Sequence, residues 1–299
     1  MSRKNKILIL GATGMLGQAL FRSFSQDDKL DIYATARNDK GLNKWFPAQL
    51  LRKIIVGVTV DKFDHVAREL ERIQPDTVIN CVGLIKQQPI ANEPLAAITI
   101  NAQLPHRIAL VCRGIDARLI QMSTDCVFNG KRGGYKESDS SNAEDLYGRT
   151  KYLGELNDQH CVTLRTSIIG HELKGRFGLL EWFLAQDKQV RGFRKAIFSG
   201  FPTVELARII HDCILPNLEL SGIYHVSSEP ISKYDLLQKV AQRYDKKIEI
   251  EPDDTFIVDR SLDSTVFREA TNYIPPSWDK LIEMMHQEFL ANRCFYSAE

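Results

Sequence analysis

The sequence has 299 residues, of which 43% are hydrophobic and 26% are charged, as in ordinary globular proteins. A chain of this length can bury a large core in one α/β unit or in two lobes. The formal net charge is +1, which excludes bulk attraction to nucleic acid or to an anionic membrane. We find no window long and apolar enough to span a bilayer. Glycines interrupt the first apolar run after Leu10, where a signal peptide would continue, so we expect a cytoplasmic protein with no nucleic-acid or membrane partner.

Apolar runs alternate with helical stretches through the first 170 residues. Continuous apolar runs predict strands buried on both faces, and apolar residues three and four apart predict helices. The expected strands are 6–10, 31–37, 76–83, 118–124 and 161–170, and the expected helices are 15–27, 62–74, 93–114 and a segment around Tyr147. This order predicts an α/β fold, a Rossmann doubly wound parallel sheet with right-handed crossovers.

The rhythm changes after Gly170. Here we expect helices over 175–190, 201–215, 232–245 and 278–290, with one strand over 222–228. Ser232 is a candidate cap for the third of these helices. We interpret this half as a smaller α/β substrate-binding C-terminal lobe. The expected division is residues 1–170 plus about 198–228 for an NAD(P)-binding Rossmann domain, and 171–197 plus 229–299 for a nucleotide-sugar-binding lobe.

A glycine-rich turn follows the first expected strand and opens the first helix. In "LGATGMLGQ", Gly11 permits a tight turn, Gly14 lets the backbone approach a pyrophosphate, and Gly17 permits close helix–strand packing. The helix N-terminus offers free N–H groups to the phosphates. We therefore predict that Gly11, Thr13, Gly14, Met15 and Gly17 bind a dinucleotide, with a plain glycine-rich turn as the alternative.

The end of the second strand selects between the two nicotinamide cofactors. NAD-binding proteins usually carry an acidic residue there for the ribose hydroxyls. In "YATARND", Thr35 and Arg37 occupy that place and Asp39 comes later. Because a guanidinium suits a 2′-phosphate, we predict NADPH, with NADH as the alternative cofactor. The competing interpretation is that Arg37 is a solvated surface charge.

Tyr147 and Lys151 lie four residues apart in "EDLYGRTKYLGE" and share one face of a helix. A carbonyl reductase needs a proton donor, and a lysine cation can stabilise the anion of a tyrosine. A hydroxyl from Ser123 or Thr124 can hold the carbonyl oxygen in line. Gly148 is unfavourable in a helix by up to ~1 kcal/mol. We expect that a side chain at Gly148 would crowd the cofactor or the substrate.

Cysteines and histidines show no metal-ligand spacing, so we predict no metal site. We expect the cysteines to be free thiols of a reducing compartment. His171 and His225 lie at the ends of expected strands and are more consistent with structural or substrate-edge residues than with ligands. The cysteines are Cys81, Cys112, Cys126, Cys161, Cys213 and Cys294.

The motifs "GATGMLG", "STDCVFNG" and "YGRTK", in this order, resemble the extended short-chain dehydrogenases/reductases. More narrowly, they resemble the dTDP-4-dehydrorhamnose reductases and related nucleotide-sugar 4-ketoreductases, and the resemblance covers nearly the whole chain. It implies that Thr124, Tyr147 and Lys151 are catalytic, that Asp125 lies beside them, and that Lys151 also holds the nicotinamide ribose. It further implies that the C-terminal lobe grips the nucleotide sugar.

The same stretch argues against the related nucleotide-sugar 4,6-dehydratases. Those enzymes follow the threonine with Asp-Glu, whereas this chain has Asp125 and Cys126. The proline that the family usually carries shortly before its Tyr-Gly is also absent from "SSNAED". These departures leave the identity of the sugar open.

Other candidate contacts come from the third strand end and from the C-terminal half. We assign Cys81, Val82 and Gly83 in "CVGLIKQ" to the cofactor. Lys86 and Gln87 are candidates to touch the sugar or the nicotinamide, with a solvated loop as the alternative. Asp125 is a further candidate substrate contact. Arg260 is a candidate for the diphosphate, with a surface ion pair as the alternative, and Trp182 and Phe183 are expected in the core more than stacked on a nucleobase.

These observations predict an NADPH-dependent reductase of a 4-keto nucleotide sugar, in deoxysugar or surface-polysaccharide synthesis. Two alternatives stay open: an epimerase that keeps its nicotinamide bound, and a non-catalytic NADP-binding regulatory subunit. We expect a monomer or a homodimer. The sequence does not identify the sugar, the nucleotide or the stereochemistry of the product.

Overall fold

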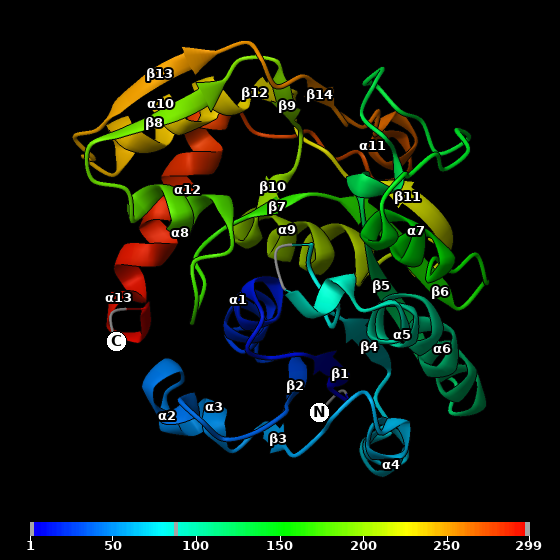
Figure 1. Cartoon of the computed structure of the whole chain (residues 1–299). Helices are drawn as coiled ribbons and strands as arrows, with labels where there is room; N and C mark the ends of the chain where they lie inside the picture. The colour runs from blue at the N-terminus through cyan, green and yellow to red at the C-terminus, as the bar shows by residue number, and fades with distance from the viewer. Residues whose placement is uncertain (1–2, 87–88, 297–299) are drawn as a thin grey trace.

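A seven-stranded, entirely parallel sheet forms the centre of the molecule (Figure 1). We describe a computed structural model over residues 3–86 and 89–296. The strand order is β11-β6-β5-β4-β1-β2-β3. The chain adds β2 and β3 on one side of β1 and then β4, β5, β6 and β11 on the other side, as in a doubly wound Rossmann sheet. Its strands are β1 (Asn5–Leu10), β2 (Leu30–Ala36), β3 (Ile54–Val56), β4 (Thr77–Asn80), β5 (Arg118–Thr124), β6 (Cys161–Thr166) and β11 (Gly222–His225).

Alternation along β1 supplies both faces of the sheet with a core. Ile7 and Ile9 belong to one hydrophobic cluster, while Leu8 and Leu10 belong to a second cluster on the other face. In Figure 1, α1 (Met15–Phe24) and α9 (Thr203–Ile209) lie on one side of the sheet. The opposite side is covered by α4 (Phe63–Ile73) and α6 (Leu104–Gly114). The expected fold class is confirmed.

The expected helix over 93–114 is continuous but contains a π-helical segment. It runs through α5 (Pro94–Ala97), a π-helical stretch (Ile98–Gln103) and α6. Pro105 has no N–H to donate to the carbonyl of Asn101, which accounts for a local change in the hydrogen-bond pattern. By length and composition this helix could cross a membrane, contrary to the expectation from sequence. Of its most apolar window, 44% is buried inside the protein.

The second half differs most from expectation. The segment 175–190 is not one helix, because only α8 (Leu179–Leu184) is helical and residues from Gln189 onward form a strand. Ser232 does cap its helix, accepting a hydrogen bond from the Asp235 N–H at 3.0 Å. The strands outside the central sheet form small sheets, as Figure 1 shows above it. They are β7 (Ile168–Ile169), β8 (Gln189–Phe193), β9 (Ala196–Phe198), β10 (Phe201–Pro202), β12 (Ile231–Ser232), β13 (Glu249–Asp253) and β14 (Val258–Asp259).

The remaining helices are short, apart from two in the C-terminal half. The helices α10 and α12 pack on each other beside the small sheets. A second π-helical stretch (Ile210–Ile214) extends α9. The remaining α-helices are α2 (Leu42–Trp45), α3 (Ala48–Leu51), α7 (Leu146–Leu153), α10 (Lys233–Arg243), α11 (Thr265–Thr271), α12 (Trp278–Ala291) and α13 (Arg293–Tyr296).

Candidate functional site

The glycine turn between β1 and α1 has the geometry of a phosphate cradle. Gly11 has φ +94°, a conformation that favours glycine. A Cβ at Gly17 would lie 2.0 Å from the carbonyl oxygen of Gly11, so this position tolerates no side chain. A Cβ at Gly14 would meet only that same oxygen, at 3.5 Å, and no side chain caps α1. Thr13 and Met15 flank Gly14. The N-terminus of α1 is therefore open to an anionic group, and the turn fits a dinucleotide pyrophosphate.

The last residues of β2 support the glycine turn, and the chain then continues into an exposed loop. The Thr35 hydroxyl accepts a 3.2 Å hydrogen bond from the Gly11 N–H, so Thr35 holds the turn in place. Arg37 follows β2 directly and is exposed. Asp39 is exposed as well, and its backbone carbonyl accepts from the Leu42 N–H. A cation rather than a carboxylate thus stands at the position next to the turn.

The loop after β4 connects the glycine turn with α7. A Cβ at Gly11 would lie 3.2 Å from Val82, and a Cβ at Gly83 would lie 3.9 Å from the Lys151 amine. Burial raises the pKa of the neighbouring Cys81 thiol to about 12. The buried Asn101 side chain holds this loop by accepting from the Leu84 N–H at 2.9 Å. The predicted cofactor residues and Lys151 are therefore contiguous.

Tyr147 lies on the first turn of α7, beside the polar end of β5. It is partly exposed, and the Thr124 hydroxyl lies close enough to its phenol to affect the pKa of the phenol. Thr124 in turn donates to the Asp125 carboxylate at 3.1 Å. Burial raises the pKa of Tyr147 above its usual range, and the nearby Cys126 and Asp125 act in the same direction. The phenol therefore holds its proton at neutral pH, as a proton donor requires.

Lys151 is only 7% exposed, and its amine donates a 2.6 Å hydrogen bond to the Met122 carbonyl on β5. Burial lowers its pKa to about 8, against the opposing effect of Glu155. The amine thus lies between β5 and Gly83, where a Cβ would be 3.9 Å from it.

The structure distinguishes the two candidate hydroxyls. Ser123 donates to the Glu155 carboxylate at 2.6 Å, whereas the Thr124 hydroxyl lies beside Tyr147. Glu155 also receives two hydrogen bonds from Arg165, each 2.8 Å long. Ser123 thus belongs to a buried polar network below the site, and Thr124 is the hydroxyl placed to contact a substrate oxygen.

The structural reason for a glycine at position 148 differs from the one expected. A Cβ at this position would lie 2.2 Å from the carbonyl oxygen of Cys126 and 2.7 Å from the side chain of Ala143. The close neighbour is thus the protein backbone, not the space for a cofactor or substrate. Glycine permits α7 to pack directly on the turn that follows β5, and this contact sets the position of Tyr147.

Charged side chains surround the open side of Tyr147. Lys86 forms a 2.8 Å ion pair with Asp145, whose carboxylate caps α7. Arg260 is partly buried and donates to the Phe128 carbonyl at 2.8 Å. Burial raises the pKa of Asp125, and Arg260 opposes that rise. Lys233 is a second cation close to Asp125. Gln87, the other candidate in this loop, lies outside the described residues.

Several residues that the sequence analysis considered have other surroundings in the structure. Phe183 is fully buried in the core, whereas Trp182 is 39% exposed. His171 is buried, 2.6 Å from Glu181 and 3.0 Å from the Tyr244 hydroxyl, and His225 contacts Arg165. All six cysteines are free thiols. Among residues 3–86 and 89–296, no group of three or more His, Cys, Asp or Glu side chains is arranged to hold a metal ion.

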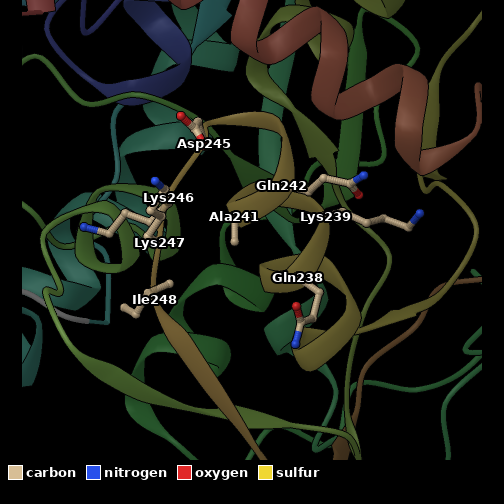
Figure 2. Close-up of a pocket in the computed structure, with 8 residues that line it drawn as sticks. All are labelled: Gln238, Lys239, Ala241, Gln242, Asp245, Lys246, Lys247 and Ile248. Atoms are coloured by element: carbon tan, nitrogen blue, oxygen red, sulfur yellow. The ribbon is translucent and has the colours of Figure 1, made fainter.

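Two surface hollows contain none of the predicted site residues. The larger, of about 540 Å³, lies at the end of α10, and Figure 2 shows its mainly polar lining. Asp245 and Lys247 are among the residues that line it. The other, of about 480 Å³, lies beside α11 and includes Arg268 and Tyr273. Neither hollow combines a proton donor with a phosphate cradle, so the carboxyl edge of the central sheet remains the candidate site.

Comparison with known families identifies the family of this chain. The family model described as "RmlD substrate binding domain" matches residues 5–288. This chain belongs to that family. Curated relatives include the methionine adenosyltransferase 2 subunit beta of Bos taurus, 25% identical over 260 residues, which cover 80% of this chain and 72% of the relative. The spore coat polysaccharide biosynthesis protein SpsK of Bacillus subtilis is 29% identical over 238 residues, 77% of this chain and 75% of SpsK.

Solved structures of the RmlD family share the fold. The dTDP-4-dehydrorhamnose reductase of Bacillus anthracis, determined in complex with NADP, superimposes with a TM-score of 0.78 at 22% identity. The match covers 95% of this chain and 99% of that protein. Nucleotide-sugar epimerases are also among the solved structures with this fold. The resemblance to the dTDP-4-dehydrorhamnose reductases and related nucleotide-sugar enzymes is confirmed, and the solved structures that share the fold include oxidoreductases and epimerases.

Proposed function

We propose that this protein reduces the 4-keto group of a nucleotide-linked deoxysugar, with NADPH as its cofactor. One arrangement carries the proposal: Tyr147 and Thr124 lie together on the open side of α7, and Lys151 from the same helix lies next to Gly83. When bound, the dinucleotide supplies the hydride. Gly11, Gly14, Gly17 and the N-terminus of α1 would hold its pyrophosphate, and Lys151 its ribose.

The side chains of the site account for the proton that the reduction consumes. The Thr124 hydroxyl orients the substrate carbonyl oxygen beside the phenol. Tyr147 donates its proton to that oxygen as negative charge develops on it. The Lys151 ammonium, charged at neutral pH because its pKa is about 8, supplies a positive charge close to the reacting groups.

The surrounding cations support a diphosphate-bearing substrate. The three cations Arg260, Lys233 and Lys86 act on two carboxylates, those of Asp125 and Asp145, so positive charge is in excess there. A dianionic diphosphate would offset that excess. The name of SpsK supports a role in surface-polysaccharide synthesis.

The test is an NADPH absorbance assay against a panel of dTDP-, UDP- and GDP-linked 4-keto sugars. We expect NADPH oxidation with at least one of them, at a rate that falls by about 10²- to 10⁴-fold in the Tyr147→Phe variant. Conversion of a nucleotide sugar without net NADPH consumption, together with tightly bound oxidised cofactor, would support the epimerase instead.

The curated relatives support a second candidate, a non-catalytic NADP-binding subunit of another enzyme. This role would require cofactor binding but no turnover. Substrate-dependent NADPH oxidation would exclude it, and NADPH binding with no oxidation across the whole panel would favour it.

A further inference from the structure

A second cation reaches the end of β2 from a distant part of the chain. Lys174 belongs to the segment 171–178, between β7 and α8. Its amine lies 5.8 Å from the centre of the Trp45 ring, in the helix that follows the end of β2. Burial and the neighbouring Arg37 both lower the pKa of Lys174, because each disfavours its charged form.

The segment that carries Lys174 is tied to the glycine turn. A Cβ at Gly178 would lie 2.6 Å from the side chain of Met15, at the start of α1. The Glu172 carboxylate accepts hydrogen bonds of 2.9 Å from the N–H groups of both Phe177 and Gly178. The first contact places the end of the segment beside the Met15 side chain, the Glu172 bonds hold its turn, and Lys174 lies close enough to Arg37 for the two charges to interact.

The two cations have no carboxylate between them. Within residues 3–86 and 89–296, neither Arg37 nor Lys174 forms an ion pair with an acidic side chain. Two like charges held together are unfavourable unless an anion joins them. The place is next to the phosphate cradle and at the end of β2, where a dinucleotide presents its adenosine ribose.

We propose that Lys174 and Arg37 together bind the 2′-phosphate of NADPH, so that a segment outside the Rossmann half selects the cofactor. This inference rests on the nicotinamide cofactor of the proposed function, but not on the sugar. Arg37 offers a planar, two-pronged donor and Lys174 a point charge, so the two can contact different phosphate oxygens. NADH lacks that phosphate and would gain nothing from either residue.

The test measures cofactor binding without any sugar. Dissociation constants for NADPH and NADH are measured by titration of the full-length protein, its Lys174→Gln, Arg37→Gln and double variants, and Lys174→Arg. Lys247→Gln is the matched control, because it removes the same charge at an exposed residue beside the α10 hollow. A charge-assisted hydrogen bond contributes about 1.5–3 kcal/mol, which corresponds to about 10- to 100-fold in affinity.

We expect Lys174→Gln to weaken NADPH binding by about 10-fold or more, with NADH binding unchanged. Lys174→Arg should keep most of the affinity, and Lys247→Gln all of it. As a probe of the phosphate alone, 2′,5′-ADP should lose affinity in parallel, whereas ADP should not. An unchanged ratio of NADPH to NADH affinity in Lys174→Gln would overturn the inference while leaving the reductase proposal intact. A wild-type protein that binds neither dinucleotide would overturn both.

Discussion

Glu155 and Arg165 form a two-pronged ion pair in the protein interior, and both side chains are 3% exposed. Glu155 lies just after the C-terminal end of α7, and Arg165 lies on the strand β6. Arg165 also donates to the ring of His225 at 3.1 Å. The helix that carries Tyr147 and Lys151 is thereby fastened to the central sheet from below.

Removing either partner of this pair should be strongly destabilising. Glu155→Ala leaves the Arg165 guanidinium buried without its partner, and Arg165→Ala does the same to the carboxylate. We expect each to lower the free energy of unfolding by about 3–5 kcal/mol. The double variant should lose much less than the sum, as a double-mutant cycle in urea would measure. Additive losses would show that the pair is not coupled.

Replacing Tyr147 with Phe should lower turnover by about 10²- to 10⁴-fold, because the proton donor is lost. Binding of NADPH should stay as in the wild type. Steady-state rates on the substrate found in the panel and a separate NADPH titration check the two parts. Near-normal turnover would show that another group delivers the proton.

Gly148→Ala should destabilise the protein by about 1–3 kcal/mol, because the added methyl group meets the Cys126 carbonyl. The control is Gly114→Ala at the end of α6, where a Cβ has no neighbour within 4 Å. That change should be neutral or slightly stabilising. Urea unfolding of both variants measures the difference, and equal stabilities would contradict the packing explanation.

The rate should depend on pH through Lys151. Burial lowers the pKa of its amine to about 8, so the ammonium is present below that pH and is lost above it. We expect kcat/KM to fall above about pH 8. Because Glu155 raises this pKa, Glu155→Gln should move the fall to lower pH. A profile that is flat to well above pH 8 in both proteins would contradict the role of this charge.

His225 should make the fold sensitive to mild acid. Burial, together with Arg165, lowers the pKa of His225 to about 4. Its neutral ring donates to the Tyr135 carbonyl at 2.9 Å and accepts from Arg165. Between its ordinary value and about 4, the unfolded chain binds the proton and the folded chain does not, so stability is lost as the pH falls. The free energy of unfolding of the wild type should drop by up to about 3 kcal/mol more than that of His225→Gln over this range. Parallel curves for the two proteins would assign the acid sensitivity to other groups.

Several residues of the site had weak sequence signals. Asn101 and Arg165 are polar residues in otherwise apolar elements, which is the usual sign of a buried hydrogen-bonding role. Glu155 lies two residues beyond the end of α7, so helix periodicity gives no signal for its contact with Arg165. Lys174 has no such sign, because its importance depends on a contact between segments far apart in the chain.

By itself, the sequence determined the Rossmann half, the phosphate cradle and the helix with Tyr147 and Lys151. Local periodicity, glycine spacing and the order of elements specify these features within a few dozen residues. The residues alone left Ser123 and Thr124 open, and the family resemblance implied Thr124; the tertiary structure gives the reason, since adjacent strand residues point to opposite faces and Ser123 contacts Glu155. It also decided the strand that begins at Gln189 and the backbone contact that requires Gly148. Those features depend on neighbours that are remote in sequence, and no local pattern records them.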